Sequence, residues 1–358
     1  MSEDITAVIL AGGEGTRLRP LTSTRPKPLL PILGRPCVEY VIRSLVDAEV
    51  GRAFLTCGYR SQDMVDQLGN GRQFGLEMRF AFEDHPAGTA GAVKLLEKEL
   101  KGTIVVVSGD VLADVDIRSL VAMHRRTGAL ATMALTTVDR PEEFGIVGLD
   151  DDGRIVRFKE KPRTEEVFSN LINAGIYVLE ERALQDIPEG EKFDFSKQLF
   201  PKLLERSEPL YGMPISGLWK DIGRPHDLLD ANIRMAERKG TTIQVPGASC
   251  SGRIVATRFE AQGCEINGPA YIGEGTVIGP RASLTRCAVG GQAAVGEGTA
   301  ISDSFLMGGC TLGPDCTVQG SLMGQGCRIG QGVSIINSVL GDGIVLDGPI
   351  TVEGRTLE

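Results

Sequence analysis

The order of apolar and polar positions divides the chain into two parts with different periods. Up to about residue 238, short apolar runs alternate with stretches whose apolar residues recur at helical spacing. Such alternation is typical of a mostly parallel sheet covered by helices on both faces. We therefore predict a Rossmann-like α/β domain, with strands at 5–10, 53–57, 77–82, 103–107 and 131–137 and helices at 38–48, 89–97, 117–125 and 225–238.

The second part has a sequence repeat. Apolar residues recur with a step of 17 in three series, which begin at Ile272, Ile278 and Leu284, and glycine follows many of them. One apolar residue per face and glycine near the corners are typical of a three-sided parallel β-helix of the hexapeptide type. We predict an α/β domain at 1–238, a linker at 239–251 and a left-handed parallel β-helix at 252–358.

The repeat also accounts for most of the eight cysteines. Cys287 lies one step of 17 after Ala270 and is followed by serines, and Cys310 and Cys327 occupy one column of neighbouring coils. No Cys-x-x-Cys pair occurs and no histidine lies near a cysteine pair, which argues against zinc. We predict that these cysteines are small packing residues.

Composition narrows the class of protein. The chain has 358 residues, 42% hydrophobic and 24% charged, and a net charge of -9, which argues against nonspecific nucleic-acid binding. No apolar run approaches the roughly 20 residues that span a membrane. The acidic residues 1–4 lead straight into a predicted strand without the pattern of a signal peptide, so we expect a cytoplasmic location.

A glycine turn follows the first predicted strand and runs into positive charge. Residues 16–27, which we call the cationic loop, carry Arg17, Arg19, Arg25 and Lys27. Backbone N–H groups at glycines and fixed cations together favour a polyphosphate. Neither the P-loop nor the dinucleotide fingerprint fits, since Leu18 stands where the latter needs glycine. The predicted nucleotide-binding residues here are Leu10, Ala11, Gly12, Gly13, Gly15 and Thr16.

Carboxylates at predicted strand ends suggest a metal and a polyol. Asp110 and Asp221 each end a strand, and Mg²⁺ prefers one or two carboxylates plus phosphate oxygens. Either aspartate is equally explained as a turn or helix cap. Glu160 and Asn173 offer hydrogen bonds to hydroxyls, and Lys161 offers a charge to a phosphate. Alternatively, these are a solvated strand end and a turn asparagine.

Seven short motifs, individually weak, occur together in a distinctive order. They are the loop ending Pro-Lys-Pro and the segments 88–91, 108–110, 144–147, 160–162, 172–175 and 219–223. In this order, and with the β-helical tail, the chain resembles the sugar-1-phosphate nucleotidyltransferases over nearly its whole length. That resemblance implies attack of a sugar-1-phosphate oxygen on the α-phosphorus of a nucleoside triphosphate, with release of pyrophosphate.

The resemblance also implies a role for each matching residue. Arg17 and Lys27 would be catalytic, holding the triphosphate and the leaving pyrophosphate, and Asp110 and Asp221 would hold Mg²⁺. The sugar phosphate would meet Gly145, Glu160, Lys161 and Asn173. The nucleophile needs no general base, because a phosphate monoester is mostly dianionic at pH 7.

The choice of base and sugar depends on fewer residues. In the thymidylyl and uridylyl enzymes that the chain resembles, glutamine tends to stand where Glu83 stands. A carboxylate accepts hydrogen bonds only, which suits the N–H groups of guanine, and backbone N–H groups near Gly88 and Thr89 would meet its O6. GTP is therefore favoured, unless Glu83 faces solvent. Overall resemblance favours mannose-1-phosphate, although a glucose-1-phosphate thymidylyl- or uridylyltransferase remains the alternative.

Two further hypotheses concern the same fold. Acyltransferases are built on this β-helix, but those the tail resembles use a histidine base and this tail contains none. Some relatives are non-catalytic regulatory subunits, which would be expected to lose the loop cations or the metal carboxylates. Because Arg17, Lys27, Asp110 and Asp221 are all present, we predict an active enzyme. We expect the β-helix to mediate homo-oligomer contacts.

Overall fold

The chain folds into two units, each of which contains two separate segments of the sequence. The computed structural model describes residues 5–83 and 85–358; residues 1–4, on which the expected location partly rests, lie outside this part. Unit 1 comprises Met1–Gly13 and Val38–Trp219, and unit 2 comprises Glu14–Cys37 and Lys220–Glu358. The cationic loop therefore groups with the C-terminal part of the chain. Domains given as continuous residue ranges do not show this grouping.

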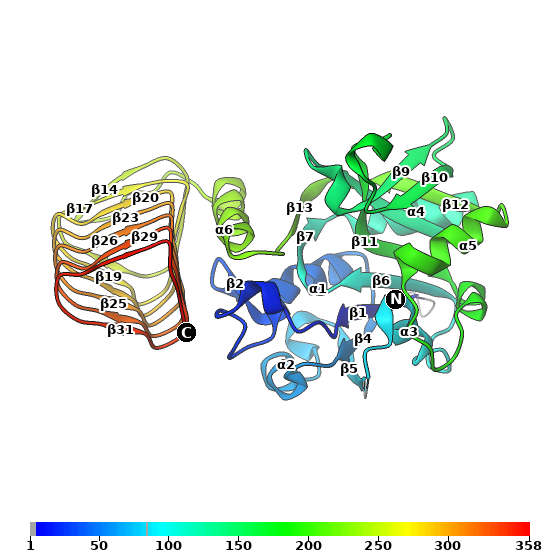
Figure 1. Cartoon of the computed structure of the whole chain (residues 1–358), viewed down its shortest axis with the longest axis horizontal. Coiled ribbons are helices and arrows are strands. Elements are labelled where there is room, and N and C mark those ends of the chain that lie inside the picture. Colours follow the sequence, from blue (N-terminus) through cyan, green and yellow to red (C-terminus); the bar gives the residue numbers. More distant parts are fainter. Residues whose placement is uncertain (1–4, 84) are drawn as a thin grey trace. The chain divides into compact units, whose positions relative to one another are not determined.

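Unit 1 is built on a nine-stranded sheet (Figure 1). Its main path runs β10-β9-β11-β6-β1-β4-β5, and β8 joins β11 to β12. The strands are β1 (Ile5–Ala11), β4 (Arg52–Cys57), β5 (Glu77–Phe82), β6 (Thr103–Ser108), β8 (Ala131–Thr137), β9 (Gly145–Leu149), β10 (Ile155–Glu160), β11 (Leu171–Glu180) and β12 (Leu210–Pro214). The predicted parallel sheet is confirmed for β6, β1, β4 and β5, whereas β11 runs antiparallel to β6 and to β8.

Helices connect these strands much as the apolar spacing predicts. They are α1 (Cys37–Asp47), α2 (Ser61–Leu68), α3 (Gly88–Lys94), α4 (Ile117–Thr127) and α5 (Phe200–Glu205), the last preceded by a π-helical turn at Phe195–Leu199. A two-stranded sheet pairs β7 (Val111–Val115) with β13 (Gly217–Asp221). Tyr177, Phe195 and Phe200 form an aromatic cluster in the core beside Val106.

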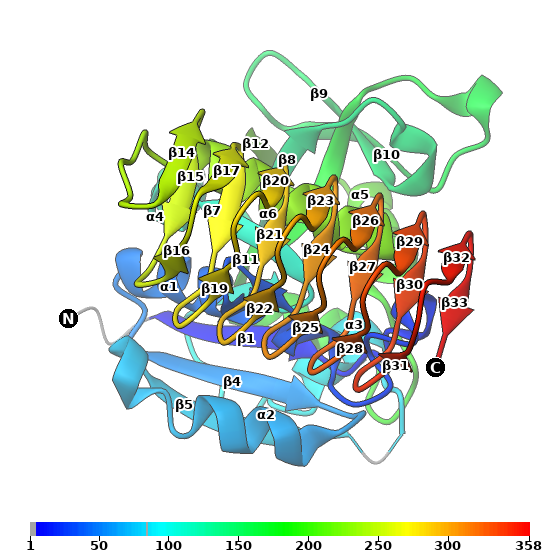
Figure 2. The same ribbon diagram turned by 90° about the vertical axis from the view of Figure 1, so that its left-hand side faces the viewer.

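Unit 2 contains the β-helix, whose coils stack in Figure 2. One seven-stranded parallel sheet comprises β14 (Ala248–Ser251), β17 (Cys264–Asn267), β20 (Ser283–Thr285), β23 (Ala300–Ser302), β26 (Thr317–Gln319), β29 (Ser334–Ile336) and β32 (Thr351–Glu353). The second comprises β15 (Ile254–Ala256), β18 (Ala270–Ile272), β21 (Ala288–Val289), β24 (Phe305–Leu306), β27 (Leu322–Met323), β30 (Val339–Leu340) and β33 (Thr356–Leu357). The third comprises β16 (Glu260–Ala261), β19 (Val277–Ile278), β22 (Ala294–Val295), β25 (Thr311–Leu312), β28 (Arg328–Ile329) and β31 (Val345–Leu346).

The pairing confirms the predicted step of 17 and the left-handed β-helix. Leu284 pairs with Ile301, and Ile278 with Val295, so each apolar series lies along one face of the interior. All eight cysteines are free thiols, and Cys310 and Cys327 are fully buried, as expected for packing residues. The first coil strand, β14, begins within the predicted linker.

Helix α6 (Pro225–Lys239) contacts both residues 31–33 and the coils of unit 2. It contacts β15 and β18 of the β-helix and β2 (Pro31–Ile32), which pairs with β3 (Arg35–Pro36). Asn232 is fully buried; its Oδ1 accepts a hydrogen bond from Leu33 N at 2.8 Å, and its Nδ2 donates one to Pro31 O at 3.2 Å. No helix in the described part of the chain combines the length and apolar character needed to cross a membrane.

Candidate active site

Three adjacent parallel strands bring their carboxyl ends to one edge of unit 1. In the register, Ala11 of β1 is paired with Cys57 of β4, and Leu10 is paired with Ser108 of β6. The backbone beyond these ends is tightly packed, since a Cβ at Gly58 would lie 2.8 Å from Gly12 O. The predicted strand-end residues of unit 1 therefore do meet, at the edge where parallel sheets bind their ligands.

Glu83 faces the glycine turn. A Cβ at Gly12 would lie 2.8 Å from Glu83 Oε1, and Glu83 Oε2 accepts a hydrogen bond from Ala87 N at 3.2 Å. Burial, and secondarily the charge of Glu83, raise the pKa of the nearby Cys57 thiol to about 12. Glu83 is half-buried, and its carboxylate lies beside the predicted nucleotide-binding backbone.

Gly88 and Thr89, the other residues predicted to meet the base, are engaged with a segment more than 100 residues later. Gly88 has φ +76°, and a Cβ there would lie 2.6 Å from Phe193 O, so only glycine fits. Thr89 donates to Asp194 Oδ1 through its backbone N at 3.0 Å and its Oγ1 at 3.3 Å. Thr89 Oγ1 also accepts a hydrogen bond from Phe195 N at 3.0 Å, so its hydroxyl already both donates and accepts within the protein.

The predicted sugar-binding residues Gly145, Glu160 and Asn173 lie on three adjacent strands. Gly145 of β9 is the register partner of Glu160 of β10, and β9 also pairs with β11, which carries Asn173. A Cβ at Gly145 would lie 2.7 Å from Glu160 Oε2, so glycine makes room for this carboxylate. Burial raises the pKa of Glu160, against the lowering effect of Lys161 and Lys197.

Asn173 is held by residues that sequence reasoning missed. Its Nδ2 donates to Tyr177 Oη at 2.8 Å and to Ser196 Oγ at 3.1 Å, while its Oδ1 accepts from Gly175 N at 2.9 Å. Both amide hydrogens are therefore used internally, which leaves Oδ1 with one lone pair for a ligand. Tyr177 and Ser196 lack any sequence signal of their own, because only the fold brings them to Asn173.

Lys161 follows Glu160 in a constrained backbone. Its φ is +43°, which is uncommon for a residue with a side chain, and its N donates to Phe144 O at 2.9 Å. The side chain is exposed, whereas that of Glu160 is half-buried. The turn thus separates the two neighbouring charges into different surroundings.

Asp110 accepts a hydrogen bond in the turn after β6. Ser108 Oγ donates to Asp110 Oδ1 at 2.6 Å, which orients the carboxylate. The turn itself is fixed by Gly109, whose N donates to Leu10 O at 2.8 Å.

In unit 2, the predicted catalytic cations lie beside the second aspartate. Lys27 is 7% exposed, and its Nζ lies 3.4 Å from Asp221 Oδ1. A Cβ at Gly223 would lie 3.0 Å from Asp221 Oδ2 and 3.5 Å from Arg17 Nη1, so Arg17 and Asp221 border the same glycine. Within the described residues Arg17 forms no ion pair, although the carboxylates of Asp221 and Asp227 border the same glycine.

The glycine turn meets the cationic loop at Gly15. Gly15 has φ +63°, and its O accepts a hydrogen bond from Thr22 Oγ1 at 2.8 Å. Thr16 begins a 3₁₀ turn (Thr16–Leu18) and is exposed. A Cβ at Gly13, in contrast, would have no neighbour within 4 Å, so the fold itself does not require glycine there.

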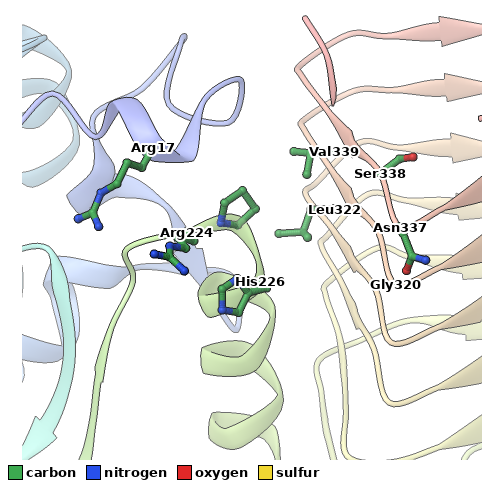
Figure 3. A pocket seen from close by; sticks show the side chains of 9 residues that line it. Arg17, Arg224, His226, Gly320, Leu322, Asn337, Ser338 and Val339 are labelled. Atoms are coloured by element: carbon green, nitrogen blue, oxygen red, sulfur yellow. The ribbon is translucent and has the colours of Figure 1, made fainter. Parts of the chain in front are cut away.

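A pocket of about 510 Å³ lies wholly within unit 2. The loop contributes Arg17, the start of α6 contributes His226 and the preceding Arg224, and the coils contribute Leu322 and Val339 among others. Figure 3 shows the guanidinium groups of Arg17 and Arg224 pointing away from the coils. The coil side of the pocket thus combines apolar and polar side chains, and the two guanidinium groups on the other side point out of the pocket.

The predicted metal ligands belong to different units, Asp110 to unit 1 and Asp221 to unit 2. The described residues contain no group of three or more potential ligands that could hold an ion. Two carboxylates nevertheless suit Mg²⁺, which completes its octahedron with water and substrate phosphate oxygens rather than a full protein cage. The two carboxylates fit this ion, and their binding of one shared ion stays a prediction.

These features define an α/β protein with an anion-binding loop at the edge of its sheet and a β-helix after it. The chain belongs to the nucleotidyl transferase family, which it matches over residues 6–238. Residues 261–357 match the GMPPB C-terminal domain.

Relatives with assigned activities differ in base and sugar. The chain is 39% identical over 227 residues, 62% of its length, to the mannose-1-phosphate guanylyltransferase catalytic subunit beta of Drosophila pseudoobscura pseudoobscura. It is 35% identical to the mannose-1-phosphate guanylyltransferase of Mycobacterium tuberculosis over 64% of its length, and 35% identical to a UTP–glucose-1-phosphate uridylyltransferase of Synechocystis over 67%. The matched part covers 60%, 64% and 66% of these relatives' own lengths, respectively.

A solved structure shares the fold of part of the chain. It is a crystal structure assigned as a glucose-1-phosphate thymidylyltransferase from Bacillus anthracis in complex with a sucrose. The superposition has a TM-score of 0.59 at 28% identity and covers 64% of this chain and 94% of that one.

Proposed function

We propose that the protein transfers a nucleotidyl group from a nucleoside triphosphate to a sugar-1-phosphate, with GTP and mannose-1-phosphate as the favoured substrates. An oxygen of the sugar phosphate forms a bond to the α-phosphorus, the bond from that phosphorus to the bridging oxygen breaks, and pyrophosphate leaves with the electron pair. The observation that carries the proposal is that Lys27 pairs with Asp221 while Arg17 borders Gly223 beside the same aspartate, in a member of the nucleotidyl transferase family.

The chemistry asks for charge and alignment rather than proton transfer. A sugar-1-phosphate is mostly dianionic at pH 7, with a second pKa of about 6, so its oxygen is already a nucleophile. Arg17, which has no carboxylate partner among the described residues, supplies positive charge to the triphosphate, and Lys27 supplies it to the departing pyrophosphate. Such fixed charges stabilise the transition state without having to reorganise.

Three adjacent strands of unit 1 carry residues that would bind the sugar. Glu160 presents a carboxylate to the sugar hydroxyls, and Asn173 presents the remaining lone pair of Oδ1. Lys161 meets the sugar phosphate from its exposed turn. The tyrosine and serine that hold the Asn173 amide keep this acceptor in one orientation.

Mg²⁺ is the proposed cofactor, with Asp110 and Asp221 as its protein ligands. When bound, the ion neutralises phosphate charge and so allows two anionic substrates to approach each other. Ser108 contributes by orienting the Asp110 carboxylate. Lys27, beside Asp221, balances the negative charge of the second ligand.

The position of Glu83 supports guanine as the base. A carboxylate against the glycine turn accepts from the N1–H and N2–H₂ of guanine, whereas thymine and uracil would need a donor as well. Two of the relatives named above are mannose-1-phosphate guanylyltransferases. The second candidate is transfer from UTP to glucose-1-phosphate, which the Synechocystis relative supports.

The test is pyrophosphate release from a panel of four triphosphates, each with mannose-1-phosphate and glucose-1-phosphate, in the presence of Mg²⁺. The proposal expects the highest kcat/KM for GTP with mannose-1-phosphate. Glu83→Gln should move the preference from GTP toward UTP by roughly tenfold or more, since an unmatched buried polar group costs discrimination of that order. No release with any pair would leave a non-catalytic subunit as the better hypothesis.

A homo-oligomer formed through the β-helix, and a cytoplasmic location, complete the proposal. At the outward positions of the third coil sheet, Val277 is 39% exposed and Val345 is 55% exposed, and these are the two positions at which we test for self-association. Sedimentation of the wild type and of the double variant Val277→Glu/Val345→Glu tests it. A lower mass for the variant is expected, and equal masses would contradict the assembly role.

A further inference from the structure

Arg25 ties the cationic loop to the coils of the β-helix, within unit 2. Its Nη1 donates to Met307 Sδ at 2.8 Å, and its Nη2 donates to Gln325 Oε1 at 3.2 Å and forms an ion pair with Asp342 Oδ2. Thr24 Oγ1 donates to the same Asp342 oxygen at 2.5 Å. Although the sequence counts Arg25 among the four loop cations, its charge is thus directed at the coils.

The coils are specialised at this contact. Met307 interrupts a run of glycines in its column, which stand at positions 273, 290, 324 and 341. It is 1% exposed, and its sulfur receives the Arg25 guanidinium. Asp342 lies one step of 17 after Gln325, and its Oδ1 accepts from Gln325 N at 2.7 Å. The repeat therefore departs from its own pattern where the loop is held.

Burial makes this ion pair different from the surface pairs of the chain. The side chains of Arg25 and Asp342 are 17% and 20% exposed, whereas those of Arg286 and Asp303, another pair on the coils, are 50% and 55% exposed. Exposed pairs hold their partners weakly because solvent screens them. A mostly buried, multiply hydrogen-bonded arginine fixes the segment that carries it.

Arg25 is two residues from Lys27 in the chain, and Lys27 is itself held at Asp221. The loop is thus fastened at neighbouring points, to the coils and to the end of β13. A loop that is already ordered loses less conformational entropy when it binds a ligand. The coil contact should therefore raise the affinity of the loop for the anion that it binds.

We infer that Arg25 and Asp342 are positioning residues, which order the cationic loop for the triphosphate from the side of the β-helix. This inference rests on the proposed function of the loop. It assigns the β-helix a part in substrate binding, in addition to assembly. Neither residue touches the substrate; both act by ordering the loop before the triphosphate binds.

The experiment compares Asp342→Asn and Arg25→Gln with Asp303→Asn. Asparagine at 342 keeps an oxygen for Gln325 N but removes the charge, and Asp303→Asn removes the same charge from a coil pair that involves no loop residue. Both loop-contact variants should raise the KM for the triphosphate roughly tenfold, the order expected for a charge-assisted hydrogen bond. The KM for the sugar phosphate and kcat should stay within about twofold, as should all parameters of Asp303→Asn.

Hydrogen exchange separates this inference from the proposed function. Amides of residues 16–27 should exchange faster in Asp342→Asn than in wild type, whether or not the protein turns over any substrate. Faster exchange without activity in the wild type would refute the proposed function and retain the anchor. Unchanged exchange, or an unchanged triphosphate KM in an active enzyme, would overturn the inference, and so would equal losses in Asp303→Asn. Arg25→Lys, which keeps a charged donor, should recover part of the affinity.

Discussion

Lys27 and Asp221 lie 194 residues apart in the sequence, and the Nζ of the first is 3.4 Å from Oδ1 of the second. The lysine side chain is 8% exposed and the aspartate side chain 32% exposed. Burying an ammonium group costs free energy unless an opposite charge lies beside it. The Asp221 carboxylate is that partner for Lys27. The pair links the cationic loop to the end of β13 and gives the account its central feature.

Replacement of this lysine should affect chemistry more than stability. Lys27→Met keeps the length of the side chain but removes the charge that stabilises departing pyrophosphate, so kcat should fall by roughly 10²–10³-fold. Lys94→Met is the matched control, because Lys94 is 13% exposed and pairs with Glu97 at 2.7 Å. Steady-state kinetics and thermal melting of both variants test the prediction. Equal, small losses of activity in the two would contradict it.

Gly13 offers a test of ligand approach to the glycine turn. A Cβ at Gly13 meets nothing within 4 Å, so Gly13→Ala should leave the melting temperature unchanged or slightly raised. If phosphates pack on this backbone, the added methyl group displaces them, and the KM for the triphosphate should rise at least about tenfold. Gly51→Ala, where a Cβ also has open space, should change neither quantity. An unaltered KM in Gly13→Ala would remove the turn from the binding site.

Asp110→Asn tests the metal proposal. Asparagine still accepts the hydrogen bond from Ser108, so the turn should survive, while the loss of the negative charge should raise the Mg²⁺ concentration needed for half-maximal rate by roughly tenfold or more. Ser108→Ala, which removes only the hydrogen bond, should have the smaller effect. A large drop in melting temperature with activity retained would identify Asp110 as a turn cap instead.

Glu160 should give the reaction a pH dependence on its sugar side. Because burial raises its pKa above the ordinary 4.5, Glu160 takes up a proton at a higher pH than an exposed glutamate. As a hydroxyl acceptor it works only when ionised, so the KM for the sugar phosphate should rise as pH falls through that raised value. Glu160→Gln should bind less tightly and lack this component, which separates it from titration of the substrate phosphate.

The stability contribution of the same group should have the opposite sign. A folded-state pKa above the unfolded one means that protonation favours the folded protein, so the contribution is present at low pH and lost as pH rises through the raised value. Denaturant unfolding of wild type and Glu160→Gln against pH measures it. Parallel pH profiles of the two proteins would show that Glu160 has no shifted pKa.

Much of the fold could be predicted from periodicity. The step of 17 locates the coils, because in a β-helix every interior position recurs once per turn, and β5 and β8 begin and end where the apolar runs do. The antiparallel half of the sheet could not be predicted in this way. Its strand β10 has only one fully buried residue, and only its pairing with β9 defines its direction.

Residues of the site could be predicted only where a short sequence motif identifies them. Lys27 and Asp221 could be selected singly, as a loop cation and a strand-end acid, and the fold joins them. The hydrogen bonds of Asn173 to Tyr177 and Ser196, and the contact of Arg25 with Asp342, depend on tertiary packing alone. Met307 did carry a signal, the break in a glycine column, but its meaning appears only with Arg25 beside it.

The most direct test of nucleotidyl transfer follows the fate of one phosphorus atom. GTP labelled at its α-phosphorus, and separately at its γ-phosphorus, is incubated with the protein, Mg²⁺ and mannose-1-phosphate, and the products are separated. The account predicts the α label in the nucleotide sugar and the γ label in pyrophosphate. Recovery of the γ label in a sugar bisphosphate, or of both labels in unchanged GTP with every sugar phosphate supplied, would contradict it.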